Sequence, residues 1–136
     1  MSSRIDDLLI QISRSPKDAE LHQSLGRAYY EGRDYAAAYQ AFVQAVELAP
    51  NDVWNHLFAS TARYVLKDHA QALQHCENAL HLAPRLSMIW VCMGDNHAEL
   101  GQYAAALSCY QTAVDMEPDN ETALKNFTRF KRWWDS

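Results

Sequence analysis

The chain has 136 residues, of which 49% are hydrophobic and 21% are charged, and its net charge at neutral pH is −5. This length and apolar content favour one folded domain over residues 1–136 and argue against intrinsic disorder. The acidic balance argues against a nucleic-acid-binding protein, and no apolar run approaches the roughly 20 residues needed to insert across a membrane.

The first fifteen residues predict a short amphipathic helix. Its opening stretch carries acidic residues and has no long apolar run, so it does not read as a secretory signal. An apolar stripe at helical spacing predicts a capping helix over residues 3–15, ending before Pro16. The stripe consists of Ile5, Leu8, Leu9 and Ile12.

Beyond this helix the sequence repeats every thirty-four residues. Pro50, Pro84 and Pro118 follow one another at this interval. Each period contains two helical stretches, because the residue before a proline is pushed out of the helical region and a polar turn divides the period in the middle. The predicted helices cover residues 19–31, 35–48, 53–66, 69–82, 87–100 and 103–116.

Particular residues mark the ends of these helices. Asp34 is suited to cap the helix that starts at residue 35, and Asn51 or Asp52 can cap the helix that starts at residue 53. We expect Asp68 to cap the helix at residue 69, and Gly101 to form the inner turn of the last period.

Small residues recur at fixed places in the repeat. Gly26, Ala38, Ala72, Gly94 and Ala106 occupy positions where paired helices would approach closely. A bulkier side chain at such a position would hold the two helices apart.

The C-terminal segment predicts a last helix over residues 121–134. Its apolar stripe consists of Leu124, Phe127, Phe130 and Trp134. The mixture of aromatic and basic residues near its end could stack on single-stranded nucleic acid. The segment is short and belongs to an acidic protein, so we interpret it as a second capping helix.

The repeat resembles the tetratricopeptide repeat (TPR). The first period carries Leu25-Gly26, Ala28-Tyr29, Ala38, Phe42, Ala45 and Pro50, and the third carries Trp90, Met93-Gly94, Ala106, Tyr110, Ala113 and Pro118. The second period is weaker, although Ala72, Ala79 and Pro84 keep its register. The resemblance implies an all-α, right-handed α-solenoid of about eight helices. Three repeats (19–52, 53–86 and 87–120) would lie between capping helices at 3–15 and 121–134.

No arrangement of residues in the sequence points to catalysis, a metal or a cofactor. His69, His75 and His81 are six residues apart, which places neighbouring rings on different helix faces. His22 and His56 occupy positions where the family usually has tryptophan, so we expect them to pack structurally. The three cysteines include no closely spaced pair, which favours a reduced, cytoplasmic setting.

The resemblance also implies where a partner would bind, since the first helix of each repeat lines a concave groove in this family. The central helix, residues 53–66, is apolar on nearly every side, so we expect its groove face to be exposed or filled by a partner. The predicted patch centres on Trp54, Phe58, Val65, Met88 and Val91. The full set of predicted groove residues is Arg27, Trp54, Leu57, Phe58, Thr61, Val65, Met88, Val91, Cys92, Asp95, Lys125 and Arg129.

Charge suggests a direction for the bound peptide. Its apolar side chains would lie in the middle of the groove and its acidic end near Lys125 and Arg129. Family members that hold the C-terminal carboxylate of heat-shock chaperones use lysine, asparagine and arginine at five groove positions. These positions hold Gln23, Arg27, Phe58, Met88 and Cys92 here, so that role is not expected.

Two functional hypotheses follow. The first is a non-enzymatic adaptor or chaperone-like protein that binds an apolar peptide or helix of a protein partner in its groove. The second is a structural protein that self-associates, forming a homo-oligomer through its terminal helices, either through Trp133 and Trp134 or through the N-terminal stripe.

Overall fold

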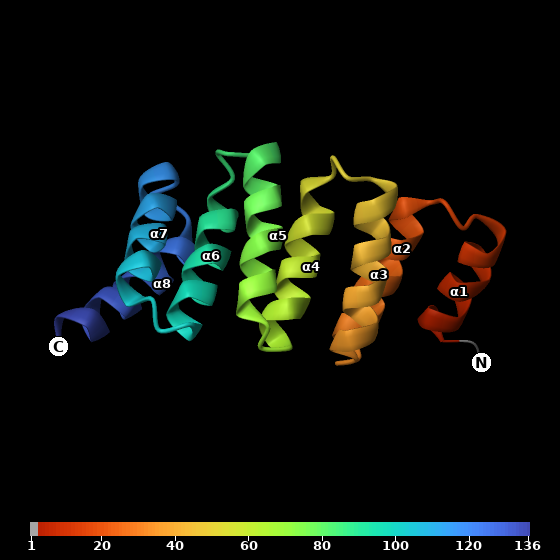
Figure 1. Cartoon of the computed structure of the whole chain (residues 1–136), viewed down its shortest axis with the longest axis horizontal. Coiled ribbons are helices and arrows are strands. Elements are labelled where there is room, and N and C mark those ends of the chain that lie inside the picture. Colours follow the sequence, from red (N-terminus) through yellow and green to blue (C-terminus); the bar gives the residue numbers. More distant parts are fainter. Residues whose placement is uncertain (1–2) are drawn as a thin grey trace. The chain divides into compact units, whose positions relative to one another are not determined.

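The computed structural model describes residues 3–136, and eight α-helices account for most of that range (Figure 1). The helices group into two compact units, one ending at Asp68 and the other beginning at His69. The first unit contains α1 (Arg4–Arg14), α2 (Ala19–Glu31), α3 (Tyr35–Leu48) and α4 (Val53–Val65). The second contains α5 (His69–Leu82), α6 (Ser87–Glu99), α7 (Tyr103–Met116) and α8 (Glu121–Asp135).

The all-α fold and its helix order are confirmed, and no strand occurs within residues 3–136. The bounds of α2, α3, α5 and α7 coincide with the predicted ranges. The helices predicted at 53–66 and 87–100 end one residue early, α1 is one residue shorter at each end than predicted, and α8 continues to Asp135.

Four residues at thirty-four-residue spacing stand immediately before the helices that open each period. Asp18 and Asp52 accept hydrogen bonds from the backbone N–H groups of Glu20 and Trp54, as N-caps do. Asn120 caps α8 in a related way. The third residue of this series is Leu86, which has no side-chain oxygen, so α6 begins without a side-chain cap.

A second series of residues marks the turns inside the periods. Arg33, Lys67 and Gly101 adopt positive φ angles of 66°, 66° and 76°. Gly101 therefore forms the inner turn as predicted, because glycine enters this region without steric cost. Arg33 and Lys67 adopt the same left-handed conformation at the price of some backbone strain.

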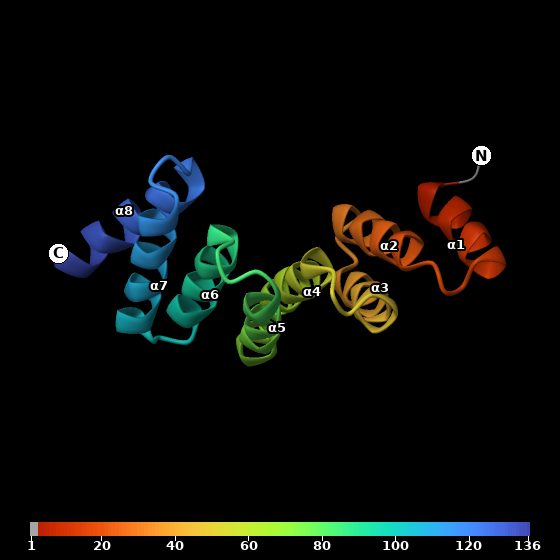
Figure 2. The same ribbon diagram turned by 90° about the horizontal axis from the view of Figure 1, so that it is seen from above.

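In the first unit, successive helices pack side by side, α1 on α2, α2 on α3 and α3 on α4 (Figure 2). Leu8 of α1 joins the buried cluster of Leu25, Ala28 and Ala41. Leu9 was expected in the same stripe, but it is 44% exposed. The expectation for Leu9 was wrong because adjacent residues on a helix diverge by about 100° and Leu8 already faces the core.

Close approach of paired helices depends on glycine in both units. A Cβ atom added at Gly26 would lie 2.5 Å from the ring of Phe42, and one added at Gly94 would lie 2.6 Å from the ring of Tyr110. Both rings are buried against the partner helix. The predicted role of these two small residues is therefore confirmed.

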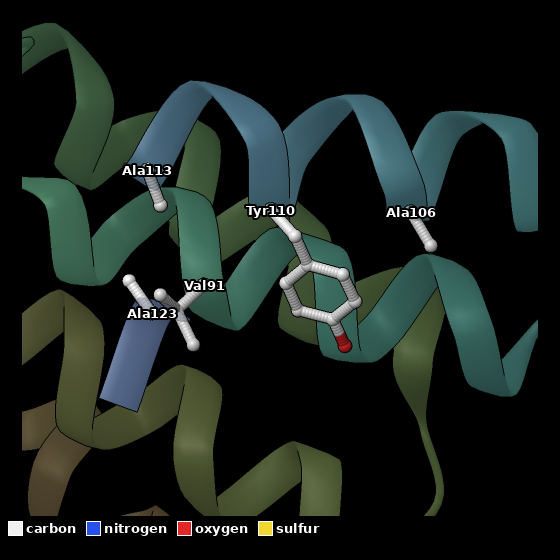
Figure 3. Close-up of a cluster of buried hydrophobic side chains, with 5 residues drawn as sticks. All are labelled: Val91, Ala106, Tyr110, Ala113 and Ala123. Atoms are coloured by element: carbon white, nitrogen blue, oxygen red, sulfur yellow. The ribbon is translucent and has the colours of Figure 1, made fainter. Parts of the chain in front are cut away.

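In the second unit, α7 lies against α6, and α8 packs on both. Figure 3 shows Tyr110 of α7 near the ribbon of α6, and Val91 of α6 beside Ala123 of α8. Phe127 and Phe130 complete this core from α8. Leu124 and Trp134, predicted for the same stripe, are instead exposed, since the face of α8 that docks runs through Ala123.

Within residues 3–136, none of the helices combines the length and the apolar character needed to cross a membrane.

Candidate functional site

The side chains of residues 3–136 form no group of three or more histidine, cysteine or acidic residues that could hold a metal ion. The histidines at the family's tryptophan position have a structural use. Hydrogen bonds of 2.9 Å join Nε2 of His22 to the carbonyl oxygen of Pro16, and Nε2 of His56 to that of Pro50. Each ring thereby links a helix to the loop that precedes it.

The predicted groove face of α4 begins at an exposed tryptophan. Trp54 lies in the first turn of α4 and is 43% exposed, which is high for so large an apolar side chain. Phe58, one turn further along, is half-buried and stacks on the buried ring of Phe42 with 5.2 Å between ring centroids. The helix therefore presents one open and one partly covered aromatic side chain along one face.

Beside Phe58 the first unit contains a pocket of about 210 Å³. It lies between α2, α3 and α4, and the buried ring of Phe42 is among its lining residues. A pocket of this volume can hold one large side chain but is smaller than a typical small-molecule site. The lining residues are Arg27, Tyr30, Glu31, Phe42, Phe58 and Thr61.

The rim of the pocket is polar. The guanidinium of Arg27 lies 5.8 Å from the centroid of the Phe58 ring, within the range of a cation–π contact. Glu31 brings a carboxylate from the last turn of α2. Partial burial, and secondarily the neighbouring Tyr35, raises the pKa of Tyr30, so its hydroxyl stays protonated at neutral pH and can donate a hydrogen bond. The pocket thus combines aromatic walls with a donor and an acceptor at its edge.

Thr61 contributes a methyl-bearing side chain whose hydroxyl is already engaged. Its Oγ1 donates to the carbonyl oxygen of Leu57 at 2.9 Å. Leu57 itself is only 3% exposed and belongs to the core, which corrects its expected place on an exposed groove face. Val65, at the end of α4, is half-buried.

Buried Asn55 joins the three helices that surround this region. It accepts a 2.8 Å hydrogen bond from Nε2 of Gln23 on α2 and donates one of 3.3 Å to the carbonyl oxygen of Ala45 on α3. The repeat pattern places an apolar residue, Ile89, at the corresponding position of the next period. Sequence reasoning missed Asn55, and its polar character at an apolar repeat position was the available signal.

In the second unit, the predicted groove residues of α6 divide into exposed and buried ones. Met88 is 47% exposed, whereas Val91 is 6% exposed and packs in the core with Ala123. The placement of Val91 on an open face was therefore wrong. Burial, with smaller contributions from Cys76 and Asp95, raises the pKa of Cys92 to about 12, so its thiol is neutral.

Asp95 is held within the protein rather than presented freely. Its carboxylate accepts a short hydrogen bond from the hydroxyl of Tyr110 and a 3.4 Å one from Nδ2 of Asn126. Burial raises the pKa of Asp95, while Tyr110 and the positive charge of Arg129 lower it and Glu99 raises it further. The residue therefore ties α6 to α7 and α8.

Lys125 and Arg129 are exposed on α8, and their place beside the acidic end of a bound peptide stays a prediction. They line an open hollow of about 500 Å³ whose lining residues all belong to this helix. The other lining residues are Glu121, Leu124, Thr128 and Arg132. The structure thus brings Arg27, Phe58 and Thr61 together in one unit, and separately groups Lys125 with Arg129 in the other.

The continuity of the predicted patch from Trp54 and Phe58 to Met88 stays a prediction, because these residues belong to different units. Tyr30 and Phe42 were not among the predicted groove residues. Phe42, one of the residues that carry the repeat resemblance, lies in the core and also lines the pocket.

Comparison with known proteins agrees with the repeat. The tetratricopeptide repeat profile matches residues 19–52 and 87–120, which together make up half of the chain. No curated protein sequence matches this chain.

Several solved structures share the fold. The MamA protein is similar with a TM-score of 0.84 and 15% identity, over 94% of this chain and 70% of that one. The first TPR domain of Spaghetti (RPAP3), bound to the HSP90 peptide SRMEEVD, has a TM-score of 0.80 and 19% identity, over 87% of this chain and 94% of that one. The Sgt2 TPR domain from Aspergillus fumigatus has a TM-score of 0.80 and 20% identity, over 87% and 80% of the two chains.

Proposed function

Because the chain belongs to the tetratricopeptide-repeat family, we propose that it is a non-enzymatic protein-interaction module that binds an apolar segment of a protein partner. The observation that carries this proposal is the pocket of about 210 Å³ between α2, α3 and α4. It offers an aromatic surface to one large side chain, and exposed Trp54 on α4 extends the apolar contact.

The polar rim defines how a peptide backbone would bind. The guanidinium of Arg27 can donate to a backbone carbonyl, and the carboxylate of Glu31 can accept from a backbone N–H. Both groups are exposed, so they would orient the peptide more than they add to affinity.

The affinity of such a contact is modest. Burying three or four large apolar side chains contributes about 1.5 to 3 kcal/mol each. Association and ordering oppose binding by about 4 to 15 kcal/mol, so at most about 8 kcal/mol remains and the dissociation constants are micromolar or weaker. An adaptor or chaperone-like role in the cytoplasm would suit such reversible binding.

A random peptide library provides the test. The full chain, immobilised, selects peptides, and fluorescence anisotropy then measures their affinities for variants. We expect Trp54→Glu to weaken binding by more than about tenfold, since it introduces a charge into an apolar contact. Trp134→Glu, which alters a similarly exposed tryptophan elsewhere, is the matched control and should bind normally.

A second pair of variants tests the pocket itself. Thr61→Phe fills it and should abolish binding, whereas Thr61→Ser keeps the hydroxyl that donates to Leu57 and should not. As a control, circular dichroism should show that both variants remain helical. Peptides that bind all these variants as tightly as the wild type would refute the proposed surface.

A further inference from the structure

The outer face of α1 carries apolar residues that the chain's described part leaves open. Leu9 is 44% exposed and Ile10 is 49% exposed. Acidic side chains, Asp6 and Asp7, stand in the first turn of α1, and Arg14 stands in its last turn. All five residues are exposed. Asp6, Ile10 and Arg14 follow one another at four-residue spacing, so the side of α1 that they share reads, from its N-terminal end, acidic, apolar and basic.

The open face of α8 carries the same order of residue types. Glu121 lies in its first turn, exposed Leu124 follows with 46% of its surface accessible, and Arg129 and Arg132 come last. These residues line the hollow of about 500 Å³, together with Lys125 and Thr128. Read from its N-terminal end, this face is acidic, then apolar and then basic.

Two faces with the same order are complementary only when the helices run antiparallel. Asp6 and Arg14 are eight residues apart, as are Glu121 and Arg129, so each pair spans about 12 Å along its helix. In an antiparallel contact that sets Arg14 opposite Glu121, Asp6 lies opposite Arg129, and Asp7 lies about one turn from Arg132. Ile10 then lies opposite Lys125 and beside Leu124.

We infer that α1 of a second copy of this chain docks antiparallel on the open face of α8. Charge complementarity selects α1 as the occupant, and the exposed apolar side chains at the centre of both faces supply the driving force. The inference is independent of the pocket between α2, α3 and α4, which takes no part in it.

The contact is heterologous, because it joins two different surfaces. The docked pair keeps one free α1 face and one free α8 face, so the contact builds head-to-tail chains unless it closes into a ring. The assembly should lengthen with protein concentration and weaken with added salt, since exposed charges are screened.

A charge swap tests the pairing by sedimentation velocity. Asp7→Lys and Arg132→Glu should each weaken self-association by about three- to tenfold. An equimolar mixture of the two variants should restore it, because the unaltered α1 of one variant meets the unaltered α8 of the other, and the reversed charges meet at the alternate contacts. Asp7 is chosen because Asp6 forms a capping box with Ser3, and Arg132 because Arg129 influences Asp95.

Matched controls separate pairing from net charge. Glu47→Lys and Arg85→Glu make the same changes at other exposed positions and should leave self-association unaffected. Ile10→Glu should weaken it by more than about tenfold through loss of apolar burial. All variants are compared at several concentrations up to about 0.5 mM, where weak contacts of small area are observed.

Three outcomes would overturn the inference. The wild-type chain could remain monomeric throughout, the mixture could fail to restore association, or Trp133→Ala could abolish association while the charge variants leave it intact. The last result would place the contact at the C-terminal tryptophans. A protein whose α8 face binds an acidic peptide instead would remain monomeric, and Arg132→Glu would then weaken that peptide's affinity.

Discussion

Replacing Gly26 by alanine gives the sharpest test of how the repeat packs. The added Cβ would lie 2.5 Å from two atoms of the Phe42 ring, about an ångström closer than ordinary van der Waals contact. Phe42 is 1% exposed and stacked on Phe58, so its ring can move only towards the adjoining pocket. Either the ring would have to leave its stacked position, or helices α2 and α3 would have to separate.

The expected loss of stability follows from two opposing effects. Alanine stabilises a helix interior by about 1 kcal/mol relative to glycine. Overpacking a close contact destabilises by about 1 to 3 kcal/mol, and a clash with a fixed ring belongs at the upper end of that range. We therefore expect Gly26→Ala to lower the free energy of unfolding by about 1 to 2 kcal/mol.

Urea denaturation followed by circular dichroism measures this loss. Gly32→Ala is the matched control, because a Cβ there would meet nothing closer than 3.5 Å and its φ of −82° suits any residue. In the double variant Gly26→Ala/Phe42→Leu the smaller side chain should relieve the clash, so the two changes should couple favourably. A Gly26→Ala protein as stable as the control would refute the argument.

Three further predictions concern single positions. Arg33→Gly and Lys67→Gly should each stabilise the protein by about 0.5 to 1 kcal/mol in the same urea assay, because glycine adopts their positive φ without strain; a loss of stability would contradict this. Because burial raises the pKa of Asp95 above 3.8, its contribution to stability is fully present below pH 3.8 and is lost as the pH rises through the folded-state value. Asp95→Asn should thus be more stable than the wild type at pH 7, and this difference in stability should shrink towards pH 4. A difference in stability that grew towards pH 4 would contradict the reasoning. Because burial raises the pKa of Cys92 from 9.0 to about 12, its thiol should react with iodoacetamide about a thousandfold more slowly in the folded protein than in urea. Peptide mass spectrometry measures both rates, and equal rates would show that the thiol of Cys92 is not buried in the folded protein.

The helices could be predicted from the sequence because their ends depend on local chemistry. Pro50 excludes the helical conformation from the residue before it, and α3 ends at Leu48. Asp34 and Asp52 satisfy N–H groups at helix starts, and α3 and α4 begin directly after them. These constraints act between residues that are close in the sequence, so helix ends can be predicted without knowledge of the packing.

The faces of the helices were harder to predict, because burial depends on contacts between helices. Leu57 and Val91 occupy one repeat position that was assigned to the groove, and both are buried. In the first period the same position holds Gln23, whose polar side chain bonds to Asn55. The family resemblance assigned this position to the groove in all three periods, whereas its burial differs from one period to the next.

The pocket could not be predicted at all from residue types. Phe42 had every mark of a core residue, and the space beside it exists because its ring lies over Gly26 and against Phe58. Such a space depends on ring orientation, which periodicity does not specify. Asp95 illustrates the same limit, since its groove position gave no sign of the hydroxyl of Tyr110.

The uncapped start of α6 has a consequence for local opening. Asp52 gives the amide of Trp54 an intramolecular acceptor, whereas Leu86 offers none to the amide of Met88. The first turn of α6 should therefore fray more often than that of α4, and its amide protons should exchange with deuterated solvent sooner. The exposed side chain of Met88 would then lie on a turn that opens more readily than the turn that carries Trp54.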